Sequence, residues 1–96
     1  MASRWGRGGD LAIRVAQAVE EIRPRAALHL YVQEAESLIR ARGRGNYITA
    51  ANDLARVRAL YQTLGEPGAW EAYIGYLRDN NRRLRALKEE LARAGL

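Results

Sequence analysis

The side chains of this chain that are able to do chemistry are few and scattered. There is no cysteine and a single histidine, His29, so a thiolate nucleophile, a disulfide and a thiolate metal site are excluded. A hydroxyl nucleophile needs a positioned base, and a metal site at His29 would need at least two carboxylates from elsewhere. Four hydroxyl residues would have to share that one histidine: Ser3, Ser37, Thr49 and Thr63. The glutamate pairs are spaced as on solvated helix faces: Glu20-Glu21, Glu34-Glu36 and Glu89-Glu90. We therefore predict that the protein is not an enzyme and has no cofactor, metal site or small-molecule substrate.

Positive charge is the feature that points to a ligand. The chain has 16 Lys and Arg against 11 Asp and Glu, a formal net charge of +5. Five cations lie close together near the C-terminus: Arg78, Arg82, Arg83, Arg85 and Lys88. Arg78, Arg82 and Arg85 follow one another at four and three residues, which places them on one side of a helix. About three or four phosphate contacts would give salt-sensitive binding without base specificity. Because carboxylates are interspersed, and Glu89 stands four residues after Arg85 where the two can pair, a solvated face of mixed charge is the alternative.

These cations lie on the stretch expected to organise the fold, Ala69 to Ala94. Trp70, Leu77, Leu84 and Leu91 recur every seven residues, and Tyr73 and Leu87 fall three places after two of them. This spacing is typical of a helix buried along one seam. A helix of this length would extend roughly 40 Å. We predict that it is the longest helix, that it is the last, and that the others pack on it.

The second half of this stretch predicts an interface. The seam is interrupted by Asn80, which is either a buried residue that fixes register or the point where the helix leaves the core. Beyond it, Leu84, Leu87 and Leu91 form a leucine stripe that shorter helices would not cover, and an uncovered apolar stripe is an interaction surface. With the aromatic end of the helix, the predicted partner-binding residues are Trp70, Tyr73, Leu77, Leu84, Leu87 and Leu91.

The rest of the chain predicts three shorter helices and no strand. Helix one runs from its N-cap Asp10 to about Ile22, where Pro24 interrupts it, with an apolar face of Leu11, Val15, Ala18, Val19 and Ile22. Helix two spans about 24–41 and helix three 47–64, capped by Asn46, with glycine turns after each. Residues 1–9 are expected to be a disordered tail and residues 10–96 one all-α domain: a four-helix antiparallel bundle of helical hairpins. No apolar run is long enough for a membrane span and no signal peptide is recognisable, so we expect a cytoplasmic protein.

The segment from Tyr31 to Leu96 resembles the C-terminal helical tail of bacterial SWIM zinc-finger proteins. The resemblance rests on these residues: Tyr47, Ala50-Ala51 and Leu54, then Arg56 to Tyr61, Leu64-Gly65, Trp70 to Ile74, Leu77-Arg78, and Arg82 through Leu91 to Leu96. The cysteine ligands of the family's zinc finger are absent, so zinc binding is not implied. What the resemblance implies is a tetratricopeptide-like stack of helix pairs that presents a surface to a protein partner, or to a second copy in a homodimer.

Two functions follow as expectations. The first is a non-catalytic protein-interaction or assembly module that acts through the leucine stripe, with self-association through the C-terminal helix. The alternative is a nucleic-acid-associated protein that binds phosphates through Arg78, Arg82, Arg83, Arg85 and Lys88.

Overall fold

A computed structural model describes residues 8–96, with side chains from residue 13 onward. This part of the chain is all-helical, as predicted, but it holds five helices rather than four, and no strand. They are α2 (Gly8–Val19), α3 (Pro24–Ala41), α4 (Arg44–Thr63), α5 (Pro67–Asn80) and α6 (Arg85–Arg93). Residues 1–7 of the predicted tail lie outside the described residues, and Gly8 and Gly9 already belong to α2.

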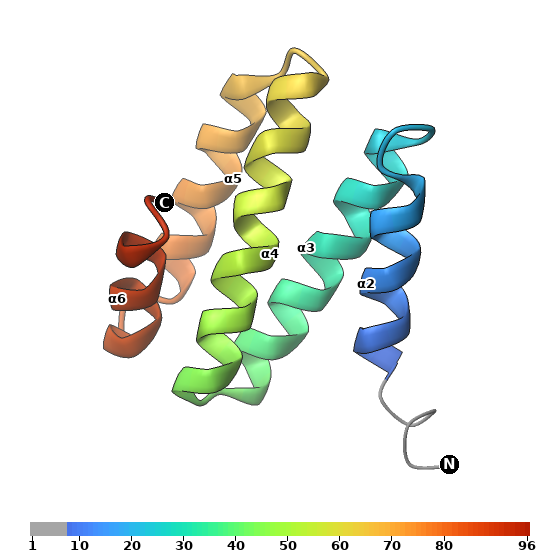
Figure 1. The fold of residues 1–96 in the computed structure, drawn as a ribbon. Coiled ribbons are helices and arrows are strands. Elements are labelled where there is room, and N and C mark those ends of the chain that lie inside the picture. Colours follow the sequence, from blue (N-terminus) through green and yellow to red (C-terminus); the bar gives the residue numbers. More distant parts are fainter. Residues whose placement is uncertain (1–7) are drawn as a thin grey trace, which may run out of the picture.

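The central element of the fold is α4. It is the longest of these helices, with 20 residues, and it packs against α3, α5 and α6, whereas α2 packs against α3 (Figure 1). Its buried side is formed by Tyr47, Ala50, Ala51, Asp53, Leu54, Val57 and Leu60. The prediction that the C-terminal helix is the longest and carries the others was wrong, because α4 has this role.

The predicted long helix is divided in two. α5 ends at Asn80, α6 begins at Arg85, and the chain folds back between them. The Asn81 amide donates to the carbonyl oxygen of Leu77 over 2.8 Å, which ends α5, and asparagine is a weak helix former in any case. A continuous helix over 69–94 would extend about 39 Å, past the end of α4 at about 30 Å. The reversal brings the leucine stripe of Leu84, Leu87 and Leu91 back onto α4.

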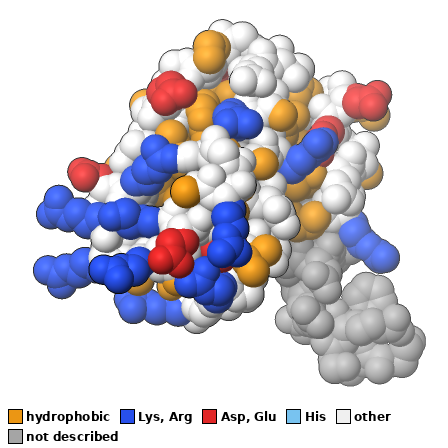
Figure 2. Space-filling model, turned by 60° about the vertical axis from the view of Figure 1, so that its left-hand side comes forward, with side chains coloured by type: hydrophobic (Ala, Val, Ile, Leu, Met, Phe, Trp, Pro, Cys, Tyr) orange, Lys and Arg blue, Asp and Glu red, His pale blue; other side chains and the backbone are white. Residues whose placement is uncertain are grey.

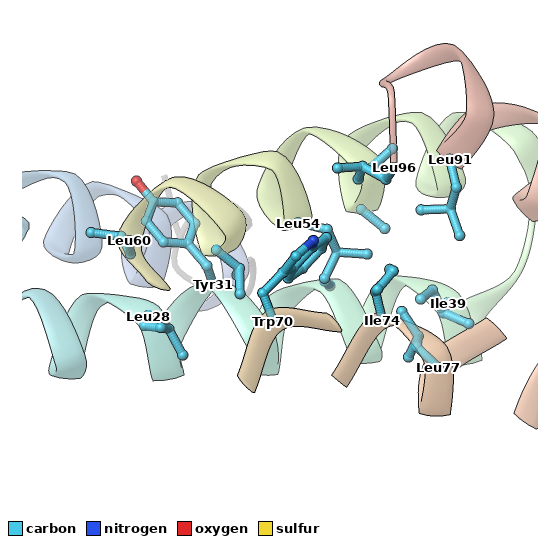
Figure 3. Packing of buried hydrophobic residues seen from close by; sticks show 14 of the residues in the cluster. Leu28, Tyr31, Ile39, Leu54, Leu60, Trp70, Ile74, Leu77, Leu91 and Leu96 are labelled. Carbon is cyan, nitrogen blue, oxygen red and sulfur yellow. The ribbon is translucent and has the colours of Figure 1, made fainter. Parts of the chain in front are cut away.

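The core is one continuous apolar cluster that spans all five helices. Tyr31, Leu28, Leu54, Leu87, Leu91 and Val57 are its largest fully buried side chains. Trp70, Ile74 and Leu77 of α5 point toward Leu54 and Ile39 in its middle (Figure 3). α3 has the predicted limits.

The first helix differs from its prediction. α2 begins two residues before Asp10, so Asp10 lies inside the helix rather than at its N-cap, and it ends at Val19. Among the side chains that the structure describes, from residue 13 onward, Ala16 of α2 is fully buried, whereas Val15 is 45% and Ile22 is 79% exposed. The predicted apolar face was therefore wrong in part, because the chain turns at residues 20–22 before Ile22 can reach the core.

The start of α4 also differs. The helix begins at Arg44, with Gly43 at its N-cap, three residues earlier than predicted. Asn46 does not cap it, because its amide donates back to the carbonyl oxygen of Arg42 over 2.7 Å. The reversal before α4 is tight: Arg42 and Gly43 both have positive φ, 65° and 103°.

Candidate binding surface at the basic end

Two turns place exposed cations at the same end of the molecule, the lower end in Figure 1. One joins α3 to α4 and the other joins α5 to α6. We call this surface the basic end and define it by Arg40, Arg42, Arg82, Arg83, Arg85 and Lys88, all of them exposed. Figure 2 shows Lys and Arg side chains gathered over the lower left of the face that carries α6.

A pocket of about 330 Å³ lies at the centre of the basic end. It brings Arg42, from the turn after α3, together with Arg82 and Arg83, from the turn after α5. Asp79, Asn80, Asn81 and Leu84 complete its lining. Three arginines from two distant parts of the chain therefore line one concave surface, with one aspartate among them.

Several arginines elsewhere are bound to carboxylates of the chain. Arg44 holds Glu89 at 2.8 Å and Glu90 at 2.6 Å, and Arg93 lies 3.6 Å from Glu90. These contacts anchor α6 to the start of α4, and the hydrogen bond from Arg44 lowers the pKa of Glu89. The Arg44 contact replaces the Arg85–Glu89 pair expected from the four-residue spacing.

Two further ion pairs also link parts of the chain that are distant in sequence. Arg25 binds Glu66 at 2.6 Å, which raises the pKa of Arg25 and lowers that of Glu66. Arg56 binds Glu20, which also accepts a 2.5 Å hydrogen bond from the Tyr31 hydroxyl. Among residues 13–96, by contrast, no cation of the basic end takes part in an ion pair. Six exposed cations without such a pair thus lie together at one end of the molecule.

The predicted arginine face does not exist as one helix stripe. Arg78 belongs to α5, Arg82 and Arg83 to the turn, and Arg85 and Lys88 to α6, so the spacing of four and three residues no longer places them in a row. Arg78 lines a different pocket, of about 240 Å³, together with Arg58 and the C-terminal Gly95 and Leu96. The other four residues remain together at the basic end.

The predicted partner-binding residues are mostly inside the chain's own core. Trp70, Leu77, Leu87 and Leu91 are 5%, 4%, 1% and 1% exposed, and Leu84 is half-buried. Tyr73 is half-buried, and its hydroxyl donates to Glu36 over 2.7 Å. Burial and this hydrogen bond raise the pKa of Tyr73. The expectation that the shorter helices leave the leucine stripe uncovered was wrong, because the stripe folds back on α4. Of the two alternatives for Asn80, the structure has the second: the residue is exposed, at the point where α5 leaves the core.

Two residues of the basic end were missed by the sequence analysis: Arg40 and Arg42. They lie about 40 residues before the predicted cluster, and only the packing of α3 with α4 and of α4 with α5 brings them near it. Tyr76 of α5, which the sequence analysis did not single out, has a side chain that is 64% exposed. It stands among apolar residues but off the seven-residue repeat of Trp70 and Leu77, and that offset was the available signal.

Two other features are absent from residues 8–96. No helix within them has the length and apolarity that crossing a bilayer requires. They bring together no group of three or more His, Cys, Asp or Glu residues that could hold a metal ion.

Comparison with known proteins adds a relative of unknown function. No family model matches the chain, and no solved structure resembles it significantly. The chain is similar to the uncharacterized protein YwqB of Bacillus subtilis (strain 168), with 37% identity over 73 residues. This match covers 76% of the present chain and 14% of YwqB, so the chain corresponds to a small part of that relative.

Proposed function

We propose that this chain is a non-catalytic helical module whose basic end binds the phosphate backbone of a nucleic acid. The observation that carries the proposal is the grouping of six exposed cations at the basic end: none of them takes part in an ion pair among residues 13–96, whereas Arg25, Arg44, Arg56 and Arg93 are bound to carboxylates. Such clusters of unpaired cations attract polyanions. A surface of helix ends and turns, rather than a single helix face, suits contacts to phosphates rather than to base edges in a groove.

The pocket among Arg42, Arg82 and Arg83 supports this function most directly. A guanidinium group has a fork of donors that matches phosphate oxygens, and several such groups around one concavity can contact consecutive phosphates. Asp79 in the lining lowers the local charge but leaves it positive. Binding of this kind weakens steeply as salt rises, because it releases counterions from the nucleic acid.

Fluorescence anisotropy with labelled single- and double-stranded oligonucleotides, at low and at moderate salt, tests the proposal. The informative variant is Arg82→Glu/Arg83→Glu, and its matched control is Arg14→Glu/Arg23→Glu. Both doublets replace exposed arginines and change the net charge by the same amount, but the second lies on α2 and the turn after it. We expect the first to weaken binding at least about tenfold and the second to have a much smaller effect. Equal effects of the two doublets, or no binding by the wild type at low salt, would refute the proposal.

A protein-interaction module is the second candidate, and a different surface now favours it. Val15 and Ile22 leave apolar area exposed around α2, and such area is suited to a protein partner or a second copy of the chain. The consecutive hairpins of α3 with α4 and of α4 with α5 are compatible with a tetratricopeptide-like, repeat-type arrangement. The molar mass in solution of wild type and of Ile22→Glu tests self-association through this surface: a dimer that Ile22→Glu converts to a monomer would support it.

A further inference from the structure

The pocket among Arg42, Arg82 and Arg83, which we call the arginine pocket, adjoins a second hollow that has a different chemistry. This hollow, of about 180 Å³, lies between the C-terminal parts of α3 and α5. It is lined by Glu36, Ile39, Arg40, Tyr76, Leu77, Asn80 and Asn81. Asn80 and Asn81 also line the arginine pocket, so the two hollows share one wall. We call the second one the tyrosine groove.

The tyrosine groove has an apolar floor and an aromatic edge. Ile39 and Leu77, each 4% exposed, lie against each other at its base (Figure 3). Tyr76 is 64% exposed, whereas Trp70 and Tyr73 of the same helix are buried or half-buried. The Tyr76 ring therefore contributes little to the core. Its face is available to a flat ligand.

The polar groups of the groove stand at its rim. Asn80 is exposed and has an amide that can both donate and accept, and the exposed Arg40 contributes a guanidinium group. Glu36 accepts a hydrogen bond from Tyr73 through one carboxylate oxygen. An aromatic face, an apolar floor and amide and guanidinium groups at the edge are the groups by which proteins hold an unpaired base.

We infer that the basic end binds single-stranded nucleic acid, with a base stacked on Tyr76 in the tyrosine groove and the adjoining phosphates in the arginine pocket. This inference rests on the proposed function and adds the strandedness of the ligand. A duplex keeps its bases stacked inside and presents only its backbone, so it engages the arginine pocket alone. A single strand engages both hollows, because its bases can turn outward while its phosphates follow the cations.

The test compares single-stranded and duplex oligonucleotides on three variants. Tyr76→Ala removes the ring, Tyr76→Phe retains it without the hydroxyl, and His29→Ala removes another exposed ring, in the first half of α3 and away from the basic end. The probes are twelve-nucleotide labelled oligo(dT) and oligo(U) and a mixed-sequence duplex, all at low salt. Circular dichroism checks each fold, which a 64% exposed side chain should not disturb.

We expect Tyr76→Ala to weaken the binding of at least one single strand about five- to fiftyfold. Duplex binding should stay within about twofold for every variant, because only the arginine pocket contributes to it. Tyr76→Phe and His29→Ala should bind the single strands like the wild type. The inference is overturned if Tyr76→Ala leaves both single-strand affinities unchanged or weakens single-strand and duplex binding equally. The proposed function would survive that result and fails separately, if the wild type binds neither kind of probe or if Arg82→Glu/Arg83→Glu has no effect.

Discussion

Arg58 on α4 donates a 2.9 Å hydrogen bond to the carbonyl oxygen of Gly95, the residue before the C-terminus. This contact fastens a tight turn at the end of α6. Gly95 has φ +78°, its N–H bonds to the carbonyl of Ala92, and the N–H of Leu96 bonds to that of Leu91 over 2.8 Å. This is the Schellman arrangement, in which a residue after the helix takes a left-handed conformation. It turns Leu96 back into the core, where it is 8% exposed.

Replacing Gly95 by alanine should destabilise the protein, whereas replacing Gly75 should stabilise it. Both sites have open space for a Cβ atom, but only Gly95 has a left-handed φ. A methyl group there should cost about 1 kcal/mol. Gly75 lies inside α5, where alanine should gain about 0.5–1 kcal/mol. Urea unfolding followed by circular dichroism measures both, and a loss of stability in each variant would contradict this account.

Leu91→Ala should lower the free energy of unfolding by about 2–4 kcal/mol, because Leu91 is fully buried against the chain's own core. The loss should not depend on protein concentration, and the molar mass in solution should not change. Thermal unfolding at two protein concentrations, with sedimentation, checks this. If Leu91 were instead at an interface between copies, the variant would dissociate and its unfolding temperature would depend on concentration.

Arg44→Ala should be more harmful than Arg25→Ala, although each removes an arginine from an ion pair. Glu90, one partner of Arg44, has a side chain only 5% exposed, whereas Glu66, the partner of Arg25, is 37% exposed. Loss of Arg44 leaves a buried carboxylate without its nearest cation, which should lower the free energy of unfolding appreciably. Loss of Arg25 breaks a surface pair, which should lower it much less. Equal losses in chemical unfolding would show that burial of Glu90 does not matter.

Asp53 should make the protein less stable as pH rises. Its side chain is buried, one carboxylate oxygen has no hydrogen-bond partner, and burial, followed by the nearby charge of Glu34, raises its pKa to about 7. Since an unfolded aspartate has a pKa near 3.8, the unfolded state releases its proton first. The contribution of Asp53 to stability therefore falls between about pH 4 and pH 7, by up to about 4 kcal/mol.

Asp53→Asn removes this titration, so the variant should gain stability relative to wild type between pH 5 and pH 8. Chemical unfolding at both pH values gives the difference, and Asp79→Asn, which neutralises an exposed carboxylate, is the control. A stability difference between wild type and Asp53→Asn that is the same at pH 5 and pH 8 would contradict the raised pKa.

The parts of the fold that were predictable are those marked by local chemistry. α3 begins at Pro24, which suits a first helical turn, and its 3–4 apolar spacing is unbroken. The division between α5 and α6 was not predictable from spacing, because leucines seven residues apart fit one straight helix and also two helices that pack on a common neighbour. Whether Leu87 and Leu91 are buried depends on which of these two arrangements the chain adopts.

The site was predictable only where it is local in sequence. Arg82, Arg83, Arg85 and Lys88 stand close together in the chain and on the surface. Which arginines remain unpaired depends on partners such as Glu89 and Glu90, which lie more than 40 residues from Arg44. The contributions of Arg40 and Arg42 depend on the tertiary packing of α3, α4 and α5, and no short-range spacing carries that information.

The shortness of α6 has a consequence for how the molecule opens. A helix of nine residues does not persist alone in water, so α6 exists only while its leucines and its glutamates are held on α4. It should therefore detach as a cooperative unit before the hairpin of α3 and α4 separates. The turn that carries Arg82 and Arg83 is the hinge of that movement. A polyanion that bridges this turn to Arg42 would fasten the hinge to the turn between α3 and α4, and it would slow amide exchange throughout α6.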